Sequence, residues 1–155
     1  MASDTCIAVL SCAWPPHSHT REPWERLHTR WWPDCPWPVR WIADTQRGRP
    51  WGDFVVEAMA GLEEFRFALV TMNDMVASAR PDTAELVRCR DEMEAIGAAY
   101  YRVCPTPECT DLFSHGRAGT HGIAAPYAKS LYPAFWRPLY LAMHAAGVPD
   151  PWTFE

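Results

Sequence analysis

Lysine is almost absent from this chain, and the other basic residues are dispersed. Lys129 is the only lysine, and the 14 Lys and Arg side chains are outnumbered by 19 Asp and Glu, which gives a formal net charge of −5. No run of basic residues could follow a phosphate backbone. The composition therefore argues against a nucleic acid as a partner.

The chain also lacks a long apolar run and a secretory signal. The apolar stretch Cys6–Leu10 is far shorter than the roughly 20 residues that a membrane-spanning helix needs. No basic residue precedes it, although a signal peptide would begin with one. The six cysteines do not have the compact spacing of a disulfide framework. We therefore expect a cytoplasmic protein without a transmembrane segment, in which all thiols are reduced.

Motifs for common phosphate, zinc and thiol sites are missing or weak. No G-x-G-x-x-G or G-x-x-x-x-G-K-[ST] motif follows a predicted strand, so a dinucleotide or P-loop site has no support. Cys104, Cys109, His115 and His121 are spaced more loosely than the ligands of zinc sites. Cys12 follows a predicted strand, but the sequence places no base near it, so a buried thiol is preferred over a nucleophile.

The chain does contain an alternation of strand and helix patterns. The expected strands are Cys6–Leu10, Val39–Ala43, Phe65–Met72 and Ala98–Val103. The expected helices run from Glu22 to Pro33, from Asp53 to Glu63, from Asp82 to Gly97 and from Pro133 to Ala146. Strands that alternate with helices predict an α/β fold with a mainly parallel sheet and helices on both faces. We expect one domain over residues 1–155.

Local signals predict several details of these elements. Pro23 suits the first turn of the first helix, and the prolines between Trp32 and Pro38 exclude regular structure there. Asp82 and Glu85 form a capping box. The residues expected to be buried by the last two helices are Leu86, Cys89, Met93, Ile96, Phe135, Trp136, Leu139 and Met143.

Polar residues follow three of the predicted strands. They are Ser11 and Cys12 after the first, Asp44 and Thr45 after the second, and Asn73 and Asp74 after the third. Ligands of open α/β sheets bind beyond the carboxyl ends of the strands, so these residues are candidate binding residues. Asp74 directly follows a buried strand and is suited to Mg²⁺ or Mn²⁺. The same spacing is equally compatible with an Asp74 that only caps a turn.

Six sequence segments carry a family resemblance. They are V-L-S-C at Val9–Cys12, W-W-P-D-C-P-W-P-V at Trp31–Val39, W-G-D-F-V-V-E-A-M at Trp51–Met59, A-L-V-T-M-N-D-M at Ala68–Met75, S-L-Y-P-A-F-W-R at Ser130–Arg137 and W-T-F-E at Trp152–Glu155. With these segments in this order, the chain resembles bacterial glycosyltransferase-like proteins of the GT-A fold associated with surface-polysaccharide synthesis. It resembles a short or truncated member with a weakened acidic metal motif.

The resemblance implies a GT-A nucleotide-sugar-binding domain, C-terminally incomplete, that moves a sugar from a nucleoside diphosphate to a hydroxyl of a saccharide or lipid-linked acceptor. The strand-end residues Ser11, Cys12, Asp44 and Thr45 would contact the donor. Asp74, with Asn73 beside it, would bind a divalent metal, Mn²⁺ or Mg²⁺, that neutralises the departing diphosphate. Glu155 would be the base that deprotonates the acceptor hydroxyl, and Trp152 a platform for the acceptor.

Two positions depart from the family pattern. Asn73 stands where the family has the first of two paired acids, and Ala13 stands where an acidic residue follows the first strand. An amide is a weaker ligand for hard cations than a carboxylate. Two alternatives to an enzyme are therefore a nucleotide-sugar-binding module without turnover and a partner that completes another transferase.

Overall fold

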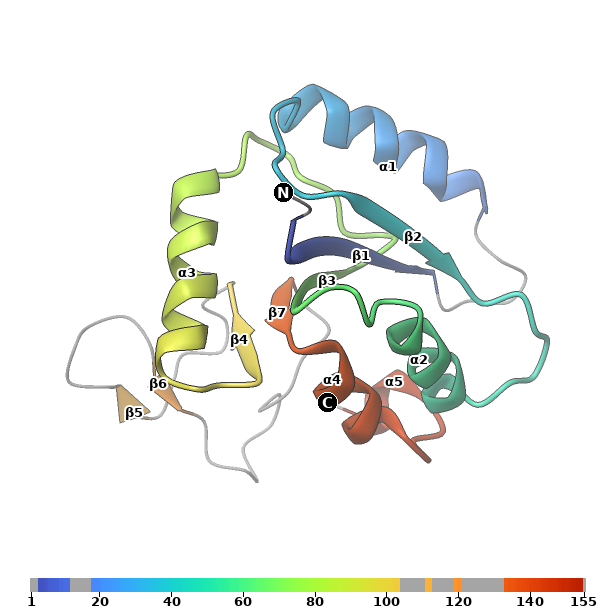
Figure 1. The fold of residues 1–155 in the computed structure, drawn as a ribbon. Helices are drawn as coiled ribbons and strands as arrows, with labels where there is room; N and C mark the ends of the chain where they lie inside the picture. Colours follow the sequence, from blue (N-terminus) through green and yellow to red (C-terminus); the bar gives the residue numbers. More distant parts are fainter. Residues whose placement is uncertain (1–2, 12–17, 104–110, 113–118, 121–132, 155) are drawn as a thin grey trace.

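The computed structural model describes residues 3–11, 18–103, 111–112, 119–120 and 133–154 (Figure 1). The strands are β1 (Thr5–Ser11), β2 (Val39–Ala43), β3 (Phe67–Met72), β4 (Tyr100–Arg102), β5 (Asp111–Leu112), β6 (Gly119–Thr120) and β7 (Ala134–Trp136). The helices are α1 (Ser18–Trp31), α2 (Trp51–Ala60), α3 (Thr83–Ala95), α4 (Pro138–Ala145) and α5 (Pro151–Phe154). A five-stranded sheet has the order β2-β1-β3-β7-β4, and β5 pairs with β6 separately, so the protein is of the α/β class.

The parallel part of the sheet is built on β1, which pairs with β2 on one side and β3 on the other. All of its residues are buried, because helices cover both of its faces. Cys6, Ala8 and Leu10 pack on one face, and Ile7 and Val9 pack on the other. A strand that is buried on both faces has a continuous apolar sequence, and this pattern predicted β1 correctly.

The sheet as a whole is mixed, so the α/β class is confirmed but the expectation of a mainly parallel sheet is not. Strand β7 runs antiparallel to both β3 and β4. The predicted helix from Pro133 to Ala146 is divided between β7 and α4, and the helical part begins only at Pro138. Proline disfavours helical backbone in the residue before it, and Arg137 is accordingly extended, with φ −78° and ψ 121°.

The burial of side chains in β7 and α4 also differs from that expected for one continuous helix. Phe135 and Trp136 are both 0% exposed, as predicted, but they are buried on opposite faces of the sheet because strand side chains alternate. Leu139 and Met143 were expected to be buried and are instead 74% and 67% exposed. The apolar residues from Phe135 to Met143 are therefore compatible with a helix and with a strand. The prediction assigned helical periodicity to residues that form β7.

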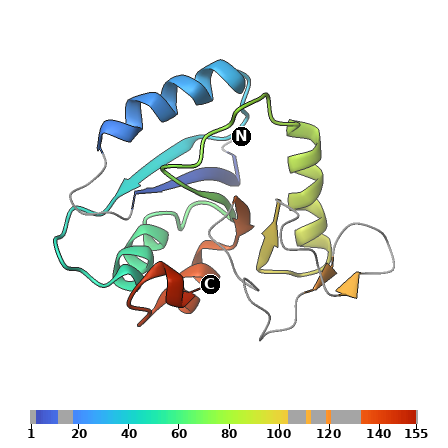
Figure 2. The same ribbon diagram turned by 180° about the vertical axis from the view of Figure 1, so that it is seen from behind.

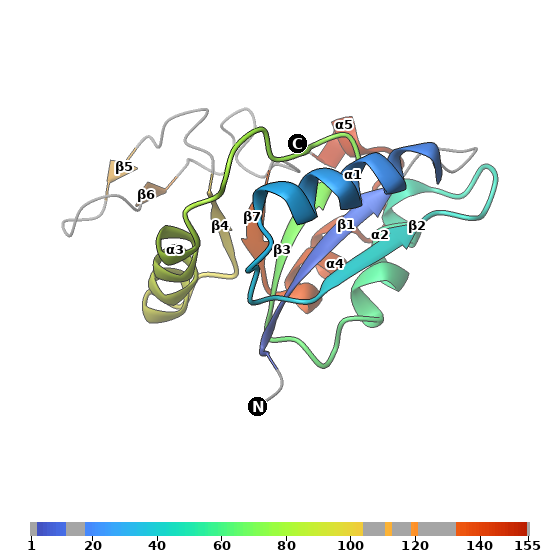
Figure 3. The same ribbon diagram turned by 90° about the horizontal axis from the view of Figure 1, so that it is seen from above.

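Helices lie on both faces of the sheet, as predicted. Helices α2, α4 and α5 contribute to one core, around Phe54 and Trp136, and α1 and α3 contribute to the other, around Trp24 and Phe135. Figure 3 shows α1 alongside β1 and β2, and Figure 2 shows α3 and β4 at the opposite end of the sheet from β2.

Helix α1 begins at Ser18 rather than at Glu22, so Pro23 lies inside the helix and not in its first turn. Thr20 in the added turn accepts a hydrogen bond from the Asn73 side chain, a tertiary contact that local sequence signals do not contain. On the inner side of the helix, the His28 ring stacks on Trp24 with centroids 4.9 Å apart and meets Trp32 edge-on at 5.7 Å. Burial between these rings lowers the pKa of His28.

Other local signals are confirmed. Residues 32–38 form neither helix nor strand, and the Asp82 side chain caps α3 by accepting a hydrogen bond from the Glu85 main chain. Gly97 follows α3 with φ +69°, a backbone conformation that glycine adopts without strain. Ile96 was expected to be buried but is 45% exposed, because α3 ends there.

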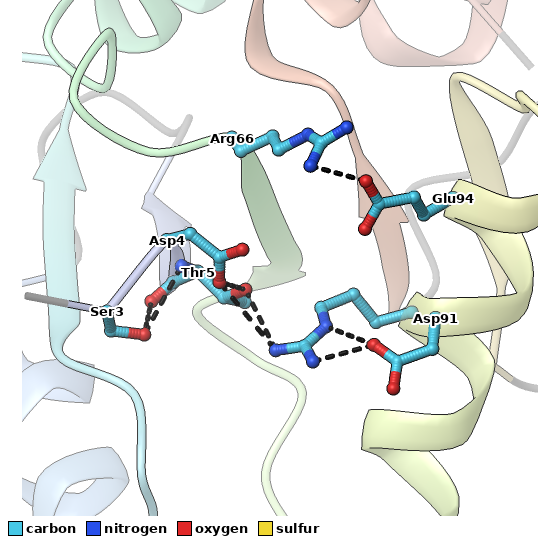
Figure 4. A network of polar contacts seen from close by, with 7 residues as sticks. Ser3, Asp4, Thr5, Arg66, Asp91 and Glu94 are labelled. Carbon is cyan, nitrogen blue, oxygen red and sulfur yellow. Dashed lines mark hydrogen bonds and ion pairs between the residues drawn. The ribbon is translucent and has the colours of Figure 1, made fainter. Parts of the chain in front are cut away.

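A polar network connects α3 to the amino ends of β1 and β3 (Figure 4). The Arg90 guanidinium lies 3.7 Å from the Asp4 carboxylate, donates to the Thr5 hydroxyl at 3.4 Å and bonds Asp91 on its own helix. Arg66, just before β3, forms an ion pair with Glu94. These contacts lie at the amino ends of the strands, whereas the candidate binding residues follow the carboxyl ends. They connect α3 to the sheet.

Helices α2 and α4 approach each other closely at Gly52. A Cβ atom added to Gly52 would lie 2.0 Å from the Ala145 carbonyl oxygen and 2.8 Å from that of Val148. The Gly52 main-chain N–H also donates to the Val148 carbonyl at 2.9 Å. Because main-chain atoms cannot move aside as a flexible side chain can, this position accepts only glycine.

Replacing Gly52 by alanine is expected to lower the free energy of unfolding by about 3 kcal/mol or more, since overpacking against main chain forces α2 and α4 apart. Urea unfolding followed by circular dichroism measures the change. Gly61→Ala is the matched control, because its Cβ would meet its nearest neighbour at 3.5 Å, and it should unfold like the wild type. Equal stability of the two variants would contradict the close contact.

Candidate functional site

The carboxyl ends of β1, β2 and β3 meet at one edge of the sheet. Ser11 is in register with Ala43, and Leu10 is in register with Met72. The main-chain N–H of Asp44 donates to the Ser11 carbonyl, and that of Asn73 donates to the Leu10 carbonyl, both at 2.9 Å. The structure therefore brings Ser11, Asp44 and Asn73 together, as the strand pattern predicted.

Ser11 is the most deeply buried polar residue of this group. Its side chain is on the face of β1 that carries Ile7 and Val9, which pack with Trp24 of α1. Ser11 is 1% exposed, and its hydroxyl has no hydrogen-bond partner among the described residues. A buried hydroxyl without a partner costs roughly 1–3 kcal/mol. Within the described part of the chain, the Ser11 hydroxyl is therefore available for a further hydrogen bond at the end of β1, on the face that α1 covers.

Asn73 connects the end of β3 to the first turn of α1. Its side-chain amide donates to the Thr20 hydroxyl at 3.0 Å, and Asn73 is 8% exposed. A second bond reinforces the connection, since the Trp24 indole donates to the Met75 carbonyl at 2.9 Å. Thr20 is a site residue that sequence reasoning missed, because the predicted helix began after it.

Asp44 and Thr45 have different surroundings although they are neighbours in sequence. Asp44 is 6% exposed, and its carboxylate accepts a hydrogen bond from the Gln46 main chain at 3.0 Å, which stabilises the turn after β2. Thr45 is exposed and lines a groove between β2 and α2. Only Asp44 of this pair therefore belongs to the buried polar group at the strand ends.

Asp74 is exposed on the turn that follows β3. The turn is closed by a hydrogen bond from the Met75 main chain to the Met72 carbonyl at 3.0 Å. This bond closes the turn without the Asp74 side chain, so its carboxylate is accessible for another role. Among the residues that the structure describes, no three His, Cys, Asp or Glu side chains cluster as metal ligands. A metal at Asp74 therefore stays a prediction.

The remaining predicted residues are only partly described. Cys12 and Glu155 lie outside the described residues, as do Cys104, Cys109, His115 and His121. Residues 151–154 form the short helix α5, in which Phe154 is 1% exposed and Trp152 is 82% exposed. Phe154 packs 5.1 Å from Trp51 and 6.0 Å from Trp136, measured between ring centroids.

The described cysteines do not form an activated thiol site. Cys6, Cys35 and Cys89 are free, as expected. Burial raises the pKa of each thiol, that of Cys6 to about 12, so all three are protonated at neutral pH. Nucleophilic chemistry at these positions is therefore disfavoured.

Comparison with protein-family models, with curated proteins and with solved structures finds no match for this chain. Within its described part, the structure contains no helix that is both long and apolar enough to cross a membrane. The function is therefore inferred from the geometry at the strand ends.

Replacing Ser11 by alanine is expected to leave the ligand-free protein equally stable or to stabilise it by up to about 1–3 kcal/mol, because this removes a buried hydroxyl that has no partner among the described residues. Thr5→Val is the matched control. The Thr5 hydroxyl is equally buried but donates to Asp4 at 2.8 Å, so its loss should destabilise by about 1 kcal/mol. Urea unfolding distinguishes the variants, and a loss of stability in Ser11→Ala similar to that in Thr5→Val would show that the fold itself uses the hydroxyl.

Proposed function

We propose that the protein is a glycosyltransferase of the GT-A kind, which moves a sugar from a nucleoside-diphosphate sugar to a hydroxyl of a saccharide or lipid-linked acceptor. The observation that carries the proposal is the polar group at the ends of β1, β2 and β3, where the buried Ser11 hydroxyl has no described partner. Ligands of open α/β sheets bind at this edge. The sequence segments that resemble the family include Ser11 and Asn73 of this group.

In this proposal, the donor binds beside Ser11, with Asp44 and Asn73 shaping the pocket from the neighbouring strand ends. Cys12 and Thr45 would contact the donor next to them. The Asn73–Thr20 hydrogen bond supports the arrangement, because it holds the first turn of α1 over the strand ends. The partial positive charge at the amino end of a helix of this length favours the negative diphosphate.

Asp74 is the proposed ligand of Mn²⁺ or Mg²⁺, for two reasons. Its carboxylate is exposed directly after β3, and carboxylate oxygens are the ligands that these ions prefer. A bound divalent ion would neutralise the charge that develops on the departing diphosphate. Glu155 is the proposed base for the acceptor hydroxyl, and the exposed Trp152 would offer that acceptor an aromatic surface.

The second candidate function is a nucleotide-sugar-binding module without turnover, or a partner of another transferase. The specific observation in its favour is the hydrogen bond that engages the Asn73 amide with Thr20, where a second carboxylate would be expected in an active metal site. Binding and transfer must therefore be measured separately.

UDP is expected to bind at least about tenfold more tightly with Mn²⁺ than with a chelator, a difference of 1.4 kcal/mol, and calorimetric titration measures both affinities. Asp74→Asn removes one charged ligand and should abolish the difference. Asp53→Asn is the matched control, since Asp53 is an exposed acid on α2. UDP affinities that are equal with Mn²⁺ and chelator in the wild type would remove the metal from the proposal.

Glu155→Gln is expected to reduce the release of UDP from UDP-glucose, with added saccharides as acceptors, by ~10²–10⁴-fold, because the base is lost while the shape is kept. UDP affinity should not change. Glu63→Gln, at another exposed acid, should retain full turnover. A wild-type protein that binds UDP but releases none from the donor would favour the module, and unchanged turnover in Glu155→Gln would exclude this residue as the base.

A further inference from the structure

Among the strands that the structure describes, β2 forms one edge of the sheet and pairs on one side only, with β1. The Pro38 carbonyl accepts from Ile7, and the Asp44 main chain donates to Ser11, both at 2.9 Å. Main-chain groups of alternate residues in a strand point to opposite sides, so residues 40 and 42 bond β1. The N–H and C=O groups of Val39, Trp41 and Ala43 therefore point away from the sheet, and the described part of the chain places no strand against them.

A groove of about 220 Å³ lies between this edge and α2, and consecutive residues from Arg40 to Ala43 line it together with Phe54 and Ala58. Side chains alternate between the faces of a strand, so a groove on one face touches four consecutive residues only where it reaches their main chain. Its volume is below the roughly 300–1,000 Å³ of pockets that enclose a whole small ligand. The groove is therefore suited to single side chains of a segment that lies along the strand.

Arg40 is the charge at the groove that an acidic partner can reach, because the other two charged residues that line it, Arg49 and Glu57, pair with each other at 2.6 Å. Arg40 contacts Glu64 at 3.1 Å, and their side chains are 44% and 63% exposed. An ion pair this exposed contributes little to stability, so an incoming carboxylate can replace Glu64. A charged residue on an edge strand also opposes pairing with the same edge of a second copy, which would bring its own Arg40. An extended segment with an acidic side chain fits this edge better than a second copy does.

We propose that β2 and α2 form a peptide-binding site, in which an extended segment of a partner protein pairs with the free edge of β2. An apolar side chain of the segment enters the groove beside Ala58, and an acidic side chain pairs with Arg40. Main-chain hydrogen bonds to Val39, Trp41 and Ala43 provide the pairing, as in other cases of strand addition. The proposal does not depend on the proposed transferase function, because it rests on the unpaired main-chain groups of β2 and on Arg40, although Thr45 lines the groove as well.

The test uses the pentapeptide acetyl-Thr-Val-Thr-Glu-Thr-amide and amide signals of the labelled protein in nuclear magnetic resonance. In an antiparallel register centred on Trp41, its valine and glutamate side chains point to the α2 face, opposite Ile42 and Arg40. Saturable shifts are expected for the amides of Val39, Trp41 and Ala43. N-methylation of the third peptide residue, whose N–H faces β2, should weaken binding at least about tenfold, whereas N-methylation of the second should not.

A matched pair of protein variants tests the same edge. Ala43→Pro removes a donor that points away from the sheet, so its thermal midpoint should stay near that of the wild type while peptide binding weakens about tenfold. Ala43→Val keeps the donor and should bind like the wild type. A large drop in thermal midpoint for Ala43→Pro would show that this N–H has a partner within the fold, and would overturn the proposal.

Two further outcomes would also overturn it. The first is an absence of shifts at β2 and α2 up to millimolar peptide, or equal affinity for the two N-methylated peptides. The second is a concentration-dependent dimer of the free protein that Ala43→Pro disrupts, because a second copy would then occupy the edge.

Discussion

The burial of β1 on both faces is the constraint on which the rest of the structure depends. A strand whose residues are all buried needs a hydrogen-bonded neighbour on each side and a helical layer on each face. Strands β2 and β3 provide hydrogen-bond partners for its main chain. Its side chains alternate between the two cores, so that Ala8 packs in one and Val9 in the other. The polar group at its carboxyl end follows from the same arrangement, because Ser11 is carried into the interior with the apolar residues that precede it.

Elements with local signals were predictable from the sequence, and elements that depend on distant partners were not. Strand β2 and the cap of α3 at Asp82 match their predictions, because a short apolar run and a capping side chain act over a few residues. Strand β7 was missed because three residues form a strand only where β3 and β4 offer edges on both sides. The start of α1 was missed for a similar reason, since Thr20 bonds Asn73 across 53 positions of sequence.

The candidate site shows the same division. Parallel strands end at the same edge, so the proximity of Ser11, Asp44 and Asn73 could be predicted from the strand pattern alone. The burial and hydrogen bonding of each residue could not be predicted in this way, because they depend on how α1 and the turns pack over the ends of the strands. Asp44 is engaged in its own turn and Asp74 is exposed, although the sequence presents both as acids after strands. A sequence pattern therefore locates such an edge, whereas the packing decides which side chains remain available there.

The contact at Gly52 joins two parts of the chain that are far apart in sequence. The first residues of α2 donate main-chain hydrogen bonds to the carbonyls of Val148 and Pro149, directly before α5. The loop after Asp44 leads into the same end of α2, and α5 carries the exposed Trp152. Because a side chain at Gly52 would separate α2 from Val148, this one glycine determines how close the strand-end loop and α5 can lie, although about 100 residues separate them.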